Sequence, residues 1–320
     1  MNGLWLRSLW LILAGAVFFA SVGLTAVWAP DLPLDQLKAR WAPPPSTFIE
    51  INGQQVHLRD EGPRHDPVPI LLVHGTSASL HTWEGWAEGL RGQRRVVRFD
   101  LPGFGLTGPN RQDDYTIDRY VLFVRSVAAR LGIDRFVIAG NSLGGEIAWA
   151  VAAALPQRVD RLILVDAAGA GGGLAGAHGE VPLAFRVARL PVLRSVARHA
   201  LPRGLVEASL RRLYGDPAKV TPQLVDQYSE LARRPGNRDA LAHRLAQAAT
   251  GPDPALLRRI QAPTLVLWGD RDRLLPPPLG ERFAREIPGA RLVLLQGLGH
   301  MPQEEDPGRS LAEVRRFLES

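Results

Sequence analysis

The stretch FVIAGNSLGGEIAW, residues 136–149, contains one serine, Ser142, between glycines and directly after an apolar run. The run is typical of a buried strand, and the apolar pattern of 143–155 is typical of a helix. A serine on a sharp strand-to-helix turn projects its hydroxyl out of the sheet, so small residues are needed two positions before and two after it. Gly140 and Gly144 meet that need. The stretch makes Ser142 a candidate nucleophile.

Apolar runs like the one before Ser142 recur along the chain, with helical patterns between them. The runs are PILLV at 69–73, RVVRF at 95–99, RLILV at 161–165, TLVLW at 264–268 and RLVLL at 291–295. The helical patterns are 116–131, 143–155, 279–287 and 307–318, and a hairpin signal, Asn52-Gly53, precedes them all. Alternating strands and helices predict an α/β fold: a mostly parallel central sheet with helices on both faces.

One region interrupts this alternation. Residues 170–252 contain no clear strand pattern and are rich in arginine and leucine at helical spacing. Thr221 followed by Pro222 is a typical helix start, with an N-cap and a proline in the first turn. We therefore expect a helical cap at 170–252, inserted into a core that comprises 47–169 and 253–320.

The amino-terminal residues 1–30 predict a membrane anchor. The segment from Ser8 to Ala29 has no charged residue, and about 20 apolar residues suffice for a helix to cross a bilayer. A cleaved signal peptide is the alternative, although Pro30 directly after Ala29 is a poor cleavage context. We expect a single-pass membrane protein with its bulk on the periplasmic or extracytoplasmic side. Residues 31–46 predict a proline-rich tether that does not fold alone.

Composition excludes several classes of site. The chain has no cysteine, which excludes disulfides, thiolate metal sites and a cysteine nucleophile. The net charge is +6, but arginines occur singly or in pairs among acidic residues, so we expect a solvated surface and no nucleic-acid partner.

A serine nucleophile requires a base, and the base requires an orienting acid. His300, in GLGHMP, follows the last predicted strand, at the sheet edge where Ser142 is expected. Asp166, Asp270 and Asp272 each follow a predicted strand, and each satisfies the chain order Ser, Asp, His. On these grounds the choice of acid stays open. The other histidines fall in the predicted cap (His178, His199, His243) or in early strands and loops (His57, His65, His81), and we assign them no catalytic role.

An oxyanion hole is expected from two backbone amides. Leu143 is the first residue of the predicted helix, so its N–H is free to bind an anion. Thr76 follows His74-Gly75 in the loop after an earlier strand, and its N–H is the expected second donor. His74 and Gly75 then have structural roles in turning the chain.

Taken together, HGT, DLPGFGLT (100–107), GNSLGG, WGDRD and GLGHMP resemble the α/β-hydrolase fold family in order and approximate spacing. The resemblance covers about 47–320 and is weakest across the cap. In the family's W-G-x-x-D pattern the final aspartate is the acid, which implies Asp272 here. Asp166 then occupies an alternative acid position used by some members, and Asp270 is a turn residue.

The resemblance implies a serine hydrolase that cleaves carboxylic esters of small or lipid-like substrates, without a metal or an organic cofactor. Serine at position 142 argues against the carboxylate-nucleophile dehalogenases and epoxide hydrolases of this fold. Hydrolases that cleave C–C bonds in ring-fission diketo acids are the alternative, but they usually carry tryptophan after the catalytic histidine, where this chain has Met301. A membrane-tethered binding protein without catalysis is a further alternative from another class. Cap arginines are candidates to bind a substrate carboxylate, although we favour a solvated helix face as their explanation: Arg186, Arg189 and Arg194.

Overall fold

A computed structural model describes residues 28–171, 201–248 and 251–319. Its centre is an eight-stranded sheet with the strand order β1-β2-β4-β3-β5-β6-β7-β8. The strands are β1 (Thr47–Ile51), β2 (Gln54–Glu61), β3 (Ile70–Val73), β4 (Val96–Phe99), β5 (Phe136–Asn141), β6 (Val159–Val165), β7 (Thr264–Gly269) and β8 (Arg291–Leu295). The pairs β1–β2 and β2–β4 are antiparallel, and all other pairs are parallel. The predicted α/β class is confirmed.

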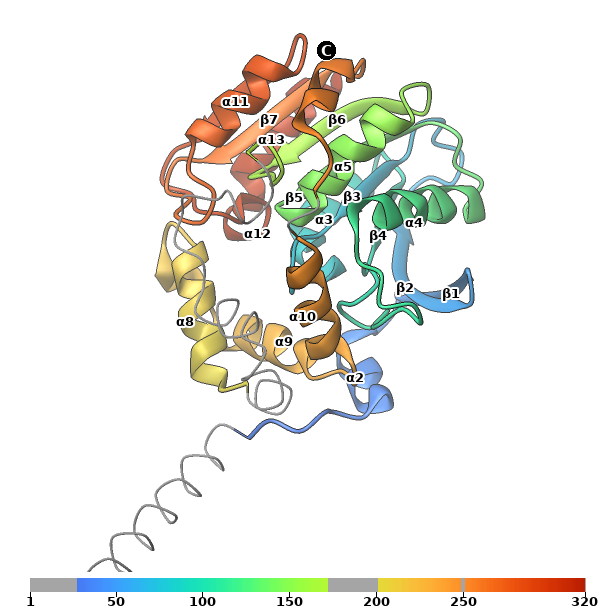
Figure 1. The fold of residues 1–320 in the computed structure, drawn as a ribbon, viewed down its shortest axis with the longest axis vertical. Coiled ribbons are helices and arrows are strands. Elements are labelled where there is room, and N and C mark those ends of the chain that lie inside the picture. The colour runs from blue at the N-terminus through green and yellow to red at the C-terminus, as the bar shows by residue number, and fades with distance from the viewer. Residues whose placement is uncertain (1–27, 172–200, 249–250, 320) are drawn as a thin grey trace, which may run out of the picture.

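Helices cover both faces of this sheet (Figure 1). The helices of the core are α3 (Glu84–Leu90), α4 (Ile117–Arg130), α5 (Leu143–Ala154), α11 (Pro278–Glu286), α12 (Pro302–Glu305) and α13 (Pro307–Glu319). Leu71 and Val73 of β3 belong to the apolar layer that includes α4 and α5, whereas Ile70 and Leu72 belong to the layer that includes α3 and α13. Both faces of the strand are therefore buried, which explains why the runs read as continuously apolar.

Cap helices α8 (Arg203–Leu213), α9 (Pro222–Ala232) and α10 (Asn237–Gln247) lie at one end of the molecule, opposite the carboxyl terminus (Figure 1). No strand occurs in 201–248, as the sequence predicts. The helix start at Thr221 is confirmed, because its hydroxyl accepts a hydrogen bond from Leu224 N at 3.2 Å. The remaining cap residues, 172–200 and 249–250, lie outside the described residues, and with them Arg186, Arg189, Arg194, His178 and His199.

The predicted tether at 31–46 contains a helix, α2 (Leu34–Trp41). Leu37 and Trp41 are buried against Leu231 of the cap. The Trp41 indole N–H donates a hydrogen bond to Glu230 Oε2 at 2.8 Å. An eight-residue helix is marginal by itself in water. The sequence gives no sign of this helix because its stabilising contacts come from a distant part of the chain.

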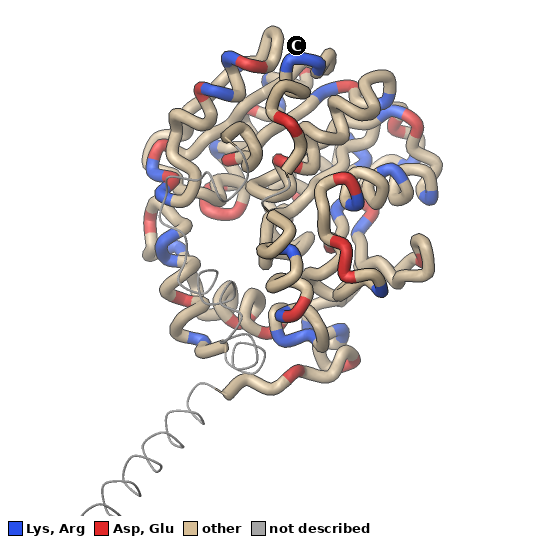
Figure 2. Tube along the Cα trace, in the orientation of Figure 1, with Lys and Arg blue, Asp and Glu red and all other residues tan. Residues whose placement is uncertain are grey.

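The predicted membrane segment, Ser8–Ala29, lies almost entirely outside the described residues. Within 28–171, 201–248 and 251–319, no helix is both long and apolar enough to cross a bilayer. Over those ranges, basic and acidic residues are interspersed along the chain (Figure 2), as the sequence predicts.

Candidate active site

Ser142 lies between the end of β5 and the start of α5, with φ 54° and ψ −118°. A positive φ in a non-glycine residue costs about 1–3 kcal/mol, and such strain persists only where the surroundings fix the backbone. A Cβ on Gly140 would overlap Gly144 O, and a Cβ on Gly144 would overlap Val73 O. The two glycines are therefore required for the strand and helix to meet at this angle. The strand–turn–helix predicted around Ser142 is confirmed.

His300 and Asp272 form a buried hydrogen-bonded pair. His300 Nδ1 lies 2.6 Å from Asp272 Oδ2, and both residues are less than 5% exposed. Asp272 Oδ1 also accepts hydrogen bonds from the N–H groups of Leu274 and Leu275, at 2.8 and 2.9 Å. Three donors on one carboxylate stabilise its ionised form. The ionised Asp272 thus holds a hydrogen on His300 Nδ1, which leaves Nε2 as the basic nitrogen.

Asn141 connects this pair to the Ser142 turn. Its side-chain N–H donates to His300 O at 3.0 Å and to Val165 O at 3.1 Å. No hydrogen bond joins Ser142 Oγ to His300 among the contacts of the described residues. Catalytic hydrogen bonds are often long in unliganded enzymes and shorten when substrate binds. The structure therefore brings the three elements that bear Ser142, Asp272 and His300 to one edge of the sheet.

The other two candidate acids have different hydrogen-bond partners. Asp166, at the end of β6, accepts a hydrogen bond from Gly269 N at 2.9 Å and is fully buried beside Asp272. Asp270 accepts from Gly297 N at 2.6 Å. Only Asp272 contacts the His300 ring, so the geometry agrees with the acid that the family resemblance implies.

The loop after β3 passes directly beside Ser142. A Cβ on Gly75 would lie 3.1 Å from Ser142 Cβ, so this glycine permits the close approach. The next residue, Thr76, is half-buried, and its N–H has no hydrogen-bond acceptor among the described residues. The Leu143 N–H belongs to the first turn of α5, where backbone donors have no partner within the helix. The expected oxyanion donors therefore lie on the two segments that flank Ser142.

His74 is fully buried and bonded to backbone through both ring nitrogens. Nδ1 lies 2.8 Å from Gly75 O, and Nε2 accepts a hydrogen bond from Leu101 N at 2.9 Å. Burial lowers the pKa of its imidazole, against the opposing effect of the Asp100 charge. A neutral imidazole with both nitrogens occupied fits the structural role expected for His74.

The cap holds the His300 loop through contacts that were not predicted from the sequence. Leu213 O, at the end of α8, accepts a hydrogen bond from His300 N at 2.6 Å. Glu305 accepts hydrogen bonds from Gly215 N at 3.0 Å and from Gly299 N at 2.8 Å. One carboxylate thus bridges the cap and the loop. No local pattern could reveal this contact, because the partners are distant in sequence.

Glu304 forms a second link between the core and the cap. Its Oε2 accepts hydrogen bonds from the hydroxyls of Tyr214 and Tyr228, both at 3.0 Å. Burial raises the pKa of Glu304 to about 7, although these hydrogen bonds act in the opposite direction. This carboxyl therefore titrates near neutral pH, at a position four residues after His300.

A buried ion pair also joins the cap to the helix that follows Ser142. Arg244 Nη2 of α10 lies 3.4 Å from Glu146 Oε2 of α5, and both residues are nearly inaccessible. Burial raises the pKa of Glu146, and the Arg244 charge opposes that rise. These contacts connect the described cap helices to α5, to the loop that carries His300 and to α12 directly after it.

The alpha/beta hydrolase fold family model matches residues 68–307, so the chain belongs to the α/β-hydrolase fold family. An uncharacterized protein of Mycobacterium tuberculosis is 30% identical over 294 residues, which cover 87% of this chain and 82% of the relative. The 2-hydroxymuconate semialdehyde hydrolase of Pseudomonas putida is 31% identical over 272 residues, 83% of this chain and 91% of the relative. A solved membrane phospholipase A superposes with a TM-score of 0.72 at 24% identity, covering 99% of this chain and 97% of that one, which shows a shared fold.

Proposed function

We propose that the protein is a serine hydrolase that cleaves carboxylic esters of small or lipid-like substrates through an acyl-enzyme. Ser142 is the nucleophile, His300 the base and Asp272 the acid that orients it. One observation carries the proposal: Ser142 occupies a strained turn at the same sheet edge as a buried His300–Asp272 pair joined at 2.6 Å.

The mechanism follows from these positions. His300 Nε2 accepts the Ser142 proton as Oγ attacks the ester carbonyl, and Asp272 stabilises the imidazolium that forms. The N–H groups of Thr76 and Leu143 donate to the oxyanion of the tetrahedral intermediate. His300 then protonates the departing alcohol. Water repeats the sequence on the acyl-enzyme and releases the acid.

Cleavage of a C–C bond in a ring-fission diketo acid is the second candidate. It is supported by the Pseudomonas putida relative, whose name assigns it to 2-hydroxymuconate semialdehyde. Met301, in the position where such hydrolases usually carry tryptophan, argues against it. The Met301 side chain is buried in the small apolar cluster of the cap, with Leu210 and Tyr214.

We also propose that residues 1–30 anchor the enzyme in a membrane, with the catalytic domain on the periplasmic or extracytoplasmic side. The support is the uncharged run from Ser8 to Ala29, long enough to span the hydrocarbon layer. The full-length chain should stay in the membrane fraction after carbonate washing, with an intact mass that includes this segment. Glutamate at both Val17 and Leu24 should release it. A mature protein that begins after Ala29 would show a cleaved signal peptide instead.

The experiment that tests the activity compares two substrate classes on the same preparation. We expect turnover of p-nitrophenyl esters over a series of acyl lengths, and little turnover of a vinylogous diketo acid. Turnover of the diketo acid alone would establish the C–C hydrolase. Absence of turnover on every acyl substrate, together with tight binding of a partner, would support the non-catalytic alternative.

A further inference from the structure

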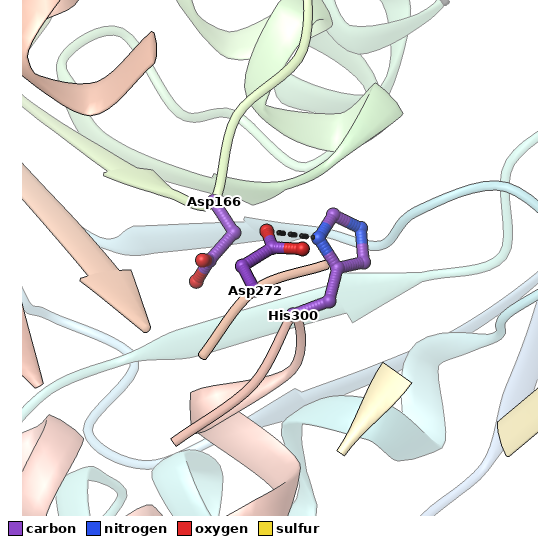
Figure 3. A group of neighbouring side chains, drawn as sticks. All are labelled: Asp166, Asp272 and His300. Carbon is purple, nitrogen blue, oxygen red and sulfur yellow. Dashed lines mark hydrogen bonds and ion pairs between the residues drawn. The ribbon is translucent and has the colours of Figure 1, made fainter. Parts of the chain in front are cut away.

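A second carboxyl lies directly behind the pair formed by Asp272 and His300. Asp166, Asp272 and His300 each place one polar side-chain atom within 4.8 Å of those of the other two. The Asp272 carboxyl lies between Asp166 and the His300 ring (Figure 3). Their exposed fractions are 0%, 4% and 3%, respectively, so water does not screen the charges. Two carboxylates at this separation cannot both ionise cheaply.

The two carboxyls differ in the number of hydrogen bonds that they accept. Asp272 accepts three: from Leu274 N, from Leu275 N and from the His300 ring. Asp166 accepts one, from Gly269 N, and its buried Oδ2 has no hydrogen-bond donor. Donors stabilise a carboxylate, whereas a buried oxygen without a donor is compatible with the protonated acid. The negative charge therefore belongs on Asp272.

Surrounding charges give the same assignment. The titratable groups that face Asp166 are Asp272, His300 and Glu305, and neither aspartate has an ion pair with a described lysine or arginine. Burial, followed by the Asp272 charge, raises the pKa of Asp166 well above its usual range. No cation in the described part of the chain compensates a second negative charge.

We propose that Asp166 carries a proton in the working enzyme, and that its neutral carboxyl leaves Asp272 as the single negative charge behind His300. This inference rests on the proposed function. A second charge would stabilise the imidazolium further, so His300 would be protonated in the resting enzyme and unable to accept the Ser142 proton. Asp166 is thus a positioning residue that sets the basicity of His300 through Asp272.

The first test is the pH dependence of kcat/KM for ester hydrolysis by wild type and Asp166→Asn. Asparagine is neutral, like the protonated Asp166 carboxyl that we propose. The pKa read from the acidic limb of the pH profile should therefore be the same in the variant as in wild type. If Asp166 were ionised, the substitution would remove a nearby charge and lower that pKa by about 1 unit or more, which would overturn the inference. Asp118→Asn, at an exposed position on α4, is the matched control.

The second test does not depend on activity. If the Asp166 carboxyl is protonated in the folded protein and ionised in the unfolded chain, folding takes up one proton above about pH 4. The unfolding constant of wild type, divided by that of Asp166→Asn, should therefore rise up to tenfold per pH unit above pH 4. A flat ratio would contradict the inference even if the enzyme hydrolyses esters. If instead no acyl substrate is turned over, the proposed function fails, and this ratio still reports whether Asp166 is protonated.

Wild-type protein alone provides a third readout, should Asp166→Asn not fold. In protein labelled with carbon-13 at aspartate side chains, one carboxyl signal should have the chemical shift of a protonated acid at pH 7. Its absence would overturn the inference.

Discussion

The described part of the chain contains two buried aspartate–histidine pairs, each associated with a serine. In one, His300 Nδ1 lies 2.6 Å from Asp272. In the other, His57 Nδ1 lies 2.8 Å from Asp100, and His57 Nε2 lies 2.9 Å from Ser46 Oγ. In the second arrangement hydrogen bonds join all three side chains, whereas among the described contacts none joins His300 to Ser142 Oγ. The difference between them lies in the setting of the serine.

Ser46 has none of the surroundings that favour attack on a carbonyl. Its hydroxyl accepts a hydrogen bond from Arg59 Nε at 2.9 Å, and it directly precedes β1 instead of a helix. His57 lies within β2 and stacks on Phe48, with ring centroids 5.0 Å apart. Ser142, in contrast, occupies a strained turn at the start of α5, beside backbone N–H groups. A Ser–His–Asp connection therefore identifies a catalytic site only together with the backbone around the serine.

The largest expected effect separates the two serines. Ser142→Ala should lower kcat for ester hydrolysis by about 10⁴-fold or more. It removes the proposed nucleophile, without which His300 and Asp272 cannot contribute to catalysis. Ser46→Ala, the same substitution in the other arrangement, should leave kcat within a factor of two or so. Steady-state kinetics on p-nitrophenyl esters measures both. Equal losses of kcat would show that the backbone conformation around each serine does not decide which serine is catalytic.

The next effect concerns the acids. Asp272→Asn should lower kcat about 10⁴-fold with little change in folding, because the amide no longer holds the His300 tautomer that leaves Nε2 basic. Circular dichroism and steady-state kinetics on the same sample check the two statements. A loss of less than tenfold would indicate that another carboxyl, such as Asp166, orients the histidine.

Asp100→Asn should affect stability and leave catalysis by the folded protein largely intact. Asp100 accepts hydrogen bonds from Leu80 N, Leu106 N and His57, and it is fully buried. Burial raises its pKa, but the contact with His57 and the nearby rings of His74 and His81 together more than reverse this, so its pKa lies below the ordinary value. An amide in place of one oxygen leaves buried N–H groups without an acceptor, at a cost of about 3 kcal/mol. Urea unfolding at pH 7 measures the loss, and unchanged stability would contradict the prediction.

The last effect is at Glu304, and it depends on pH. Its pKa is raised to about 7 in the folded protein, above the pKa of glutamate in the unfolded chain. The stability that neutral Glu304 contributes to the fold is therefore fully present below the unfolded-state pKa, and it is lost as the pH rises towards 7. Relative to Glu304→Gln, wild type should lose up to about 3 kcal/mol of stability between about pH 4.5 and 7. Denaturant titrations across this range test it, with Glu281→Gln on the exposed face of α11 as the control. A pH-independent difference would contradict a raised pKa.

The sequence predicts the features that are encoded by residues close together in the chain. The Ser142 turn rests on adjacent residues, and the sheet around it rests on short apolar runs, so both were predicted correctly. The residues alone did not separate Asp272 from Asp166, because both follow strands that end at the same sheet edge. Their different partners, His300 and Gly269, became visible only in three dimensions.

The features that were missed depend on distant contacts. His57 received no role in the sequence analysis, yet antiparallel pairing of β2 with β4 brings it to Asp100. The contacts of Glu304 with Tyr214 and Tyr228 join α12 of the core to the cap helices, far away in the sequence. Helix α2 likewise depends on burial against α9. In each case the partner of a side chain comes from a distant part of the chain, and the spacing of residues in the sequence does not reveal it.

Ser142, and not Ser46, is the proposed nucleophile. The direct measurement is peptide mass spectrometry of the native protein after reaction with a fluorophosphonate. We expect one adduct, on the peptide that contains Ser142, and no adduct in Ser142→Ala. Persistent labelling of Ser142→Ala, or an adduct on the Ser46 peptide of wild type, would contradict it.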